Sequence, residues 1–124
     1  MSWLAVGLGA AFGAWLRWGL GVLLNAVHSY LPLGTLAANL GGGFLIGIAV
    51  AFFGEHASLS PEWRLFAITG FMGGLTTFST FSAEAMLLLQ RGQYLWAFGH
   101  TALHLVGSIA FCMAGFAIYR TLFQ

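Results

Sequence analysis

Four long apolar segments constrain the fold of this chain more than any other feature. They run over residues 3–24, 33–53, 63–89 and 94–122, and only short polar turns separate them. A helix needs roughly 20 apolar residues to span a bilayer, so each segment is long enough. We therefore expect an all-α integral membrane protein, with four transmembrane helices that form one domain over residues 1–124.

The composition supports membrane lipid as the solvent. Only 6% of the residues are charged and 60% are hydrophobic, whereas soluble domains carry about 25% charged residues. A soluble fold of 124 residues could not bury so much apolar surface. The net charge of +1 argues against binding to nucleic acid, which needs a basic patch. No basic region precedes the first apolar segment, so we expect no cleaved signal peptide.

The arginines say little about orientation in the membrane. Arg64 and Arg120 would share one side of a four-helix bundle, and Arg17 and Arg91 would lie toward the other. An excess of Lys and Arg in cytoplasmic loops normally sets the orientation. Such an even balance leaves two readings open: a weak bias toward one orientation, or insertion both ways. The second reading would allow an antiparallel dimer of identical subunits.

The third segment is interrupted by a polar, glycine-rich stretch at residues 70–82, which holds three glycines, five hydroxyl side chains and three phenylalanines, two of them three residues apart. A helix in lipid cannot leave backbone groups unpaired unless protein or water receives them. We therefore expect a broken helix at residues 73–76. Carbonyl groups freed there can hold a hard cation, and the half-helix that follows can point its N–H groups at an anion.

Phe78 and Phe81 lie three residues apart among these hydroxyl groups. Two aromatic residues at this spacing share a helix face, and ordinary packing is the usual explanation. An aromatic ring has a positive edge, however, so the two ring edges could contact a small dehydrated anion. A site without a fixed positive charge would bind the anion without trapping it.

Several polar residues inside the spans remain open to two readings. Thr35 and Asn39 lie four residues apart on one face of the second segment, where they could hydrogen-bond between helices or line a polar path. Arg17 could reach the membrane interface or place positive charge at a vestibule that attracts anions. Glu84 could pair with an arginine or carry water and protons.

A stripe along the fourth segment carries a polar or small residue at every fourth position: His100, His104, Ser108 and Cys112. Two histidines at this spacing can share a metal ion. The sequence shows no HExxH pattern and no neighbouring pair of acids, so we expect the stripe to face a partner or a watery vestibule instead. His104 and Ser108 lie deeper in the segment and are the candidates for lining a pore.

The sequence also resembles a known family. Residues 73–82, GGLTTFSTFS, resemble the signature of the small fluoride channels called Fluc or CrcB. Three further pieces match in the same order: GAWLRW at residues 13–18, GTLAAN at residues 34–39, and the pair Gly107-Ser108. The resemblance covers nearly the whole chain, including its length and its four spans.

The resemblance implies an antiparallel, dual-topology homodimer in the inner (cytoplasmic) membrane, with two fluoride pores. It also implies a structural sodium ion (Na+), not transported, which the backbone carbonyls of Gly73 and Thr76 of both subunits would hold. Arg17 matches a vestibule arginine. The residues that match the family's fluoride pore are Phe78, Phe81 and Asn39, together with the hydroxyl residues Ser79, Thr80, Ser108 and Thr35.

The function implied by the resemblance is that of a channel and not of an enzyme: passive export of fluoride, which lowers its cytoplasmic concentration. Two other functions would suit a small four-helix membrane protein. A small multidrug-type proton-coupled exporter would need a carboxylate deep in the first helix, and that segment has none. A haem-binding membrane anchor would use His100 or His104 as an axial ligand.

Overall fold

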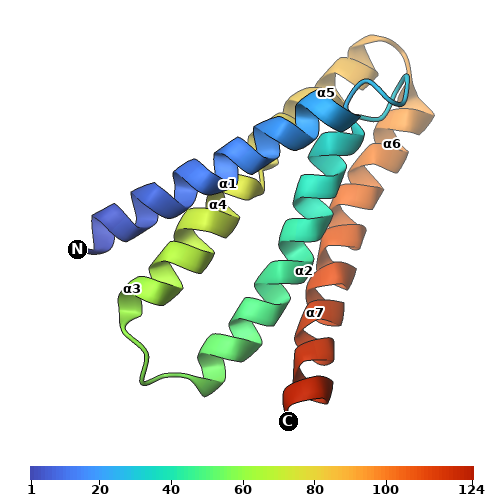
Figure 1. The fold of residues 1–124 in the computed structure, drawn as a ribbon. Helices are drawn as coiled ribbons and strands as arrows, with labels where there is room; N and C mark the ends of the chain where they lie inside the picture. Colours follow the sequence, from blue (N-terminus) through green and yellow to red (C-terminus); the bar gives the residue numbers. More distant parts are fainter.

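The computed structural model describes residues 1–124, and all of its regular elements are helical (Figure 1). Two stretches, η1 and η2, are π-helical turns inside longer helices. Three helices, over Ser2–Leu24, Leu33–Glu55 and Tyr94–Phe123, are long and apolar enough to cross a membrane, which confirms the expected all-α membrane architecture. The elements in order are α1 (Ser2–Leu24), α2 (Leu33–Glu55), α3 (Pro61–Arg64), η1 (Leu65–Met72), α4 (Gly73–Leu75), α5 (Phe78–Gln90), α6 (Tyr94–Ala102), η2 (Leu103–Gly107) and α7 (Ser108–Phe123).

The connections lie at two ends of the molecule. The turn between α1 and α2 and the turn between α5 and α6 lie at one end, whereas the loop before α3 and both termini lie toward the other (Figure 1). The amino group of Met1 is 3.7 Å from the Glu62 carboxylate, which places the N-terminus beside α3. Helix α1 packs along η1 and α4, and α2 makes its most extensive contact with α7.

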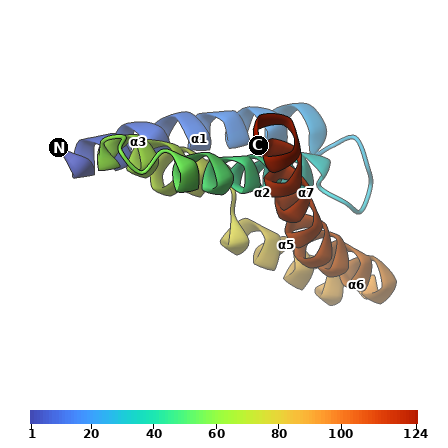
Figure 2. The ribbon, with the colours of Figure 1, turned by 90° about the horizontal axis from the view of Figure 1, so that it is seen from below.

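The third apolar segment changes direction after α4. The helix ends at Leu75, and Thr76 and Thr77 have extended backbones, with φ/ψ of −88/155° and −151/122°. Helix α5 then leaves the layer that contains α1, α2 and α3 and runs beside α6 (Figure 2). Gly73 and Gly74 are still helical, so the extended residues are Thr76, the last residue of the expected stretch, and Thr77, just beyond it. β-Branched side chains favour this backbone conformation.

Thr77 also begins the next helix. Its hydroxyl oxygen accepts a hydrogen bond from the Thr80 N–H at 3.1 Å, which makes Thr77 the N-cap of α5. Such a cap contributes about 1 kcal/mol. Thr76 therefore follows the end of one helical segment and Thr77 starts the next, and this pair fixes where α5 departs.

Two glycines set the close contact between α2 and α7. A Cβ atom added to Gly47 would overlap the carbonyl oxygen of Cys112, and one added to Gly115 would overlap the carbonyl oxygen of Phe44. Small residues at a helix interface allow backbones to approach in lipid, where no hydrophobic force drives helices together. The pair α2–α7 is therefore held by backbone-to-backbone packing.

Large apolar side chains cover the outside of the chain. Trp3, Leu95 and Phe98 are 72%, 89% and 76% exposed, which is far more than a soluble protein tolerates over a continuous surface. The buried apolar cluster is small, and its members are Ala38, Met72 and Leu75. This distribution suits a protein surrounded by lipid or by further copies of itself.

We expect Gly47→Ala to lower the melting temperature of the detergent-purified protein, because the added methyl group must displace the Cys112 carbonyl. Overpacking of this kind costs about 1–3 kcal/mol. Thermal unfolding followed by circular dichroism measures the change. Gly54→Ala is the matched control on the same helix, since a Cβ there meets no atom within 4 Å. Equal melting temperatures for the two variants would contradict the packing argument.

Candidate functional site

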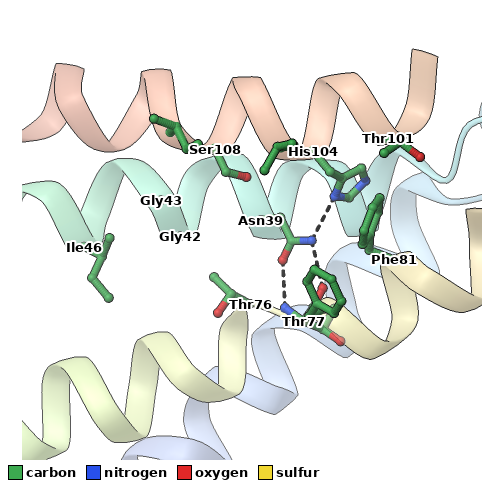
Figure 3. Close-up of a pocket in the computed structure, with 13 residues that line it drawn as sticks. Asn39, Gly42, Gly43, Ile46, Thr76, Thr77, Phe81, Thr101, His104 and Ser108 are labelled. Carbon is green, nitrogen blue, oxygen red and sulfur yellow. Dashed lines mark hydrogen bonds between the residues drawn. The ribbon is translucent and has the colours of Figure 1, made fainter. Parts of the chain in front are cut away.

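A cavity of about 520 Å³ lies beside the break in the third segment. Its wall combines residues of α2, α5, α6, η2 and α7 with the extended threonines, as Figure 3 shows for most of them. Both phenylalanines of the signature line it. The full lining is Asn39, Gly42, Gly43, Ile46, Thr76, Thr77, Phe78, Phe81, Thr101, His104, Leu105, Ser108 and Ile109.

The side chain of Asn39 pairs with the backbone of Thr77 across this cavity (Figure 3). Its Oδ1 accepts from the Thr77 N–H at 2.7 Å, and its Nδ2 donates to the Thr77 carbonyl at 3.0 Å. Backbone groups away from water need partners, and an extended residue in a broken helix has lost its helical ones. The Asn39 amide therefore replaces both helical hydrogen bonds of Thr77.

This pairing also determines which atom of the Asn39 amide faces the His104 ring. The Asn39 Nδ2 lies 2.9 Å from His104 Nδ1. An amide nitrogen only donates, so His104 accepts at Nδ1. Neutral His104 must then carry its hydrogen on Nε2. The orientation of one side chain on α2 thus selects the tautomer of a histidine on η2.

Aromatic rings close one side of the cavity. The ring centroids of Phe78 and Phe81 are 5.4 Å apart at an interplanar angle of 65°, so one ring turns its edge toward the other. Phe81 also lies against His100 and His104, with centroid distances of 5.4 and 4.8 Å. Phe78 is 80% exposed, so the cavity is open on its side.

Glu84 connects α2, α5 and α6 in a second polar group. Its Oε2 accepts a hydrogen bond from the Thr35 hydroxyl at 2.7 Å, and its Oε1 lies 3.4 Å from His100 Nε2. The rings of His100 and His104 are 4.4 Å apart. A line of polar side chains therefore runs from Thr35 through Glu84 and the two histidines to Asn39.

Two backbone carbonyls at the break lack their usual helical donors. The N–H of Thr77, which would bond the Gly73 carbonyl in a continuous helix, donates to Asn39. The N–H of Thr80, which would bond the Thr76 carbonyl, donates to the Thr77 hydroxyl. The carbonyl oxygens of Gly73 and Thr76 are therefore free for another partner, and hard cations take oxygen ligands of this kind.

Arg17 reaches the same region from α1. Its Nε donates a hydrogen bond to the Gly74 carbonyl at 3.0 Å, so the guanidinium group sits at the C-terminal end of α4, where a helix dipole favours positive charge. The vestibule role of Arg17 stays a prediction. The Arg17 side chain also provides a hydrogen-bond donor for the Gly74 carbonyl, a third backbone group at the break after the N–H and the carbonyl of Thr77.

The fold brings together only some of the residues singled out in the sequence. Phe78, Phe81, Asn39 and Ser108 line the same cavity. The other hydroxyl residues of the expected fluoride path, Thr35, Ser79 and Thr80, are not part of its lining. Thr35 bonds Glu84, the Ser79 hydroxyl is 3.4 Å from that of Thr77, and the Thr80 N–H bonds Thr77.

Sequence reasoning missed two features of the site. Gly43 and Thr101 line the cavity, and their spacing of four residues from Asn39 and of three from His104 was the available signal. The sequence also shows no acid near His100 and His104, whereas the fold places Glu84 beside them. That contact depends on the direction of α5 after the break, which no local spacing encodes.

Comparison with known proteins identifies close relatives of the whole chain. A family model described as "CrcB-like protein, Camphor Resistance (CrcB)" matches residues 4–116. A protein of Cupriavidus pinatubonensis (strain JMP 134 / LMG 1197), named "Fluoride-specific ion channel FluC", is 61% identical over 122 residues, which are 98% of this chain and 97% of the relative. Proteins with the same name from Pseudomonas putida (strain W619) and Pseudomonas syringae pv. maculicola are 62% and 56% identical, over 95% and 96% of this chain and 93% and 94% of their own lengths.

We expect Asn39→Ala to destabilise the protein by about 1–3 kcal/mol, because it leaves the N–H and carbonyl of Thr77 without partners away from water. Thermal unfolding in detergent measures this loss. Ser108→Ala is the control, since it removes a polar group from the same cavity wall without breaking the pairing with Thr77. If Asn39→Ala unfolds at the temperature of the control, the amide does not hold the break.

Proposed function

This chain belongs to the CrcB-like family, and from that membership we propose that it is a fluoride-selective ion channel that exports fluoride passively. The observation that carries the proposal is the match over nearly the full length to relatives named as fluoride-specific channels. The cavity beside Asn39 supports it, because four residues of the family signature line it: Thr76, Thr77, Phe78 and Phe81.

Passive export needs no energy source beyond the membrane potential. Hydrogen fluoride enters a cell as a neutral acid and ionises inside, where the potential is negative. Moving one charge through 100 mV is worth about 2.3 kcal/mol, so the anion leaves through an open, selective path. The chain accordingly needs a binding path for the anion and no coupled proton carrier.

We infer that fluoride passes along the cavity wall between the two phenylalanines and the hydroxyl of Ser108. The ring edges of Phe78 and Phe81 carry partial positive charge, and Ser108 can donate a hydrogen bond. Asn39 uses its amide hydrogens on Thr77 and His104, so it acts chiefly by holding the path in shape. Weak ligands of this kind admit an anion without trapping it.

The functional unit we propose is an antiparallel, dual-topology homodimer in the inner membrane, with two pores. Phe78 is 80% exposed in the single chain and Gly73 is also exposed, so both residues face outward where a second copy would lie. The even distribution of the four arginines is compatible with insertion in both orientations.

We also propose that the free carbonyls of Gly73 and Thr76 hold a sodium ion together with the same carbonyls of the second copy. Four backbone oxygens without other donors suit a hard cation. The ion would neutralise the partial charges of two helix ends that face each other. In this role sodium joins the two subunits and is not transported.

Neither alternative function gains support. The acidic residues of the chain are Glu55, Glu62 and Glu84, so α1 carries no carboxylate for proton coupling, which a multidrug-type exporter would need. A haem anchor would need the axial histidine to face an open pocket. His100 is 2% exposed and packs against Phe81 and His104. His104 lines the cavity, but its Nδ1 is bonded to Asn39 and its Nε2 is buried.

Fluoride efflux from liposomes that contain the purified protein tests the channel directly. Valinomycin and potassium balance the charge, and chloride efflux is measured in parallel. We expect fast fluoride efflux with negligible chloride efflux. A folded protein that releases neither anion would overturn the proposal.

We expect Phe81→Ile to reduce fluoride efflux about tenfold, which corresponds to about 1.4 kcal/mol of lost interaction along the path. The branched side chain fills similar space but has no positive ring edge. Phe123→Ile, near the C-terminus, is the matched control because its side chain lies outside the cavity. Equal efflux through both variants would remove Phe81 from the path.

We expect the melting temperature and the dimer fraction to rise with sodium concentration and not to rise with potassium concentration. A ligand that binds only the native dimer stabilises it in proportion to the logarithm of its concentration. Thermal unfolding and size-exclusion chromatography in sodium-free buffer measure both quantities. A response that is identical for the two cations would contradict a specific sodium site.

A further inference from the structure

We propose that Glu84, His100 and His104 form a binding site for a divalent transition metal ion of the Zn²⁺ class, and that occupancy of this site inhibits the channel. The three residues come from α5, α6 and η2. Their candidate ligand atoms, one from each side chain, lie within 4.8 Å of one another. Binding of the metal is independent of the proposed function, whereas the inhibition rests on it.

The three atoms that would bind the metal are all left without hydrogen-bond partners. Glu84 Oε1, His100 Nε2 and His104 Nε2 are buried and unpaired, while the opposite atoms Glu84 Oε2 and His104 Nδ1 are engaged with Thr35 and Asn39. Polar atoms that are left unpaired away from water destabilise the fold. A shared cation would satisfy all three at once.

The geometry needs only a small adjustment. Ligand atoms about 2.1 Å from a tetrahedral zinc ion lie roughly 3.4 Å apart, and Glu84 Oε1 is 3.4 Å from His100 Nε2. That contact is too poorly aligned for a hydrogen bond, so the metal would not have to compete with one. The His104 ligand atom lies within 4.8 Å of the other two, so it must move closer by at most about 1.4 Å to reach this spacing.

The donor set selects the kind of metal. Two imidazole nitrogens and one carboxylate oxygen suit Zn²⁺ and similar divalent ions, and they leave a fourth position for water or an anion. Sodium and calcium prefer sites made only of oxygen. The side chains of His100 and His104 are almost fully buried, at 2% and 5% exposure, so the site is held by the fold and not by a mobile surface.

A metal ion can reach the cluster from the end of the molecule where the two turns meet. A cavity of about 240 Å³ there is lined by Glu84, His28 and Arg91 among others. His104 lines the larger cavity on the other side. The cluster of Glu84, His100 and His104 therefore lies between the two cavities. A metal ion bound there would block a path that joins them.

Metal binding would also disturb Asn39. A ligand at His104 Nε2 requires the ring hydrogen to sit on Nδ1, but Nδ1 now accepts from the Asn39 amide. Two N–H groups would then face each other, so the Asn39–His104 hydrogen bond must break. A fixed positive charge beside the path would in addition hold fluoride too firmly to release it.

Titration of the detergent-purified protein with Co²⁺, followed by visible absorption, and metal analysis after incubation with Zn²⁺ and gel filtration test the binding. We expect one metal ion per chain. We also expect at least a tenfold loss of affinity in Glu84→Gln and in His100→Ala, since even outer-shell changes cost about 10–100-fold. Absence of binding by the wild-type protein, or full binding by both variants, would overturn the site.

A second variant locates the metal without touching the cluster. The chain has four histidines, and replacing His28 and His56 together by Gln leaves only His100 and His104. The double variant should bind Co²⁺ with unchanged affinity and spectrum. Loss of binding there would place the metal elsewhere and overturn the proposal, even if the cluster variants fail to fold.

Fluoride efflux in the presence of Zn²⁺ tests the inhibition. We expect efflux to fall at least tenfold on addition of Zn²⁺ and to recover with a chelator, both in the wild type and in the double histidine variant. Binding without inhibition would overturn the regulatory part of the proposal and keep the site. Absence of fluoride efflux before any metal is added would instead contradict the proposed channel, and the Co²⁺ titration would still decide the site.

Discussion

A chain that interrupts its helix at membrane depth must give the freed backbone groups new partners, and here one side chain supplies two of them. The Asn39 amide bonds both the N–H and the carbonyl of Thr77, so α5 can leave the line of α4 without stranding polar groups in lipid. The new direction of α5 brings Phe81 and Glu84 to α6 and η2. Without this pairing the N–H and the carbonyl of Thr77 would lack partners at the point where α5 departs.

The pairing of Asn39 with Thr77 lies between a group of carbonyls that could face a cation and a cavity that could hold an anion. On one side of Thr77 the carbonyls of Gly73 and Thr76 are free to face a cation. On the other side the phenylalanines and Ser108 face a cavity suited to an anion. In the function proposed above, the backbone of one residue separates the two sites, and oppositely directed backbone and ring dipoles would stabilise the opposite charges.

Much of the fold follows from local physics. Pro61 stands at the first turn of α3, where its missing N–H costs nothing, and the apolar lengths give the membrane architecture. Asn39, Phe78, Phe81 and Ser108 were predictable as site residues because they are polar groups or signature residues within spans. The contact of Glu84 with His100 was not predictable, since it depends on the angle of α5. The sodium ion and the antiparallel dimer stay predictions, because both concern a second copy of the chain.

The broken third segment also imposes an order on membrane insertion. Helices α1 and α2 can enter the bilayer as independent spans, in line with assembly of stable helices in two stages. The 15 residues of α3, η1 and α4 and the 13 residues of α5 are each too short to span alone. The break between them becomes tolerable only once Asn39 is already in place. Because α2 is synthesised first, Asn39 is in the membrane before the broken third segment emerges from the ribosome. A circular permutant in which the third segment preceded α2 would be retained or degraded during biogenesis.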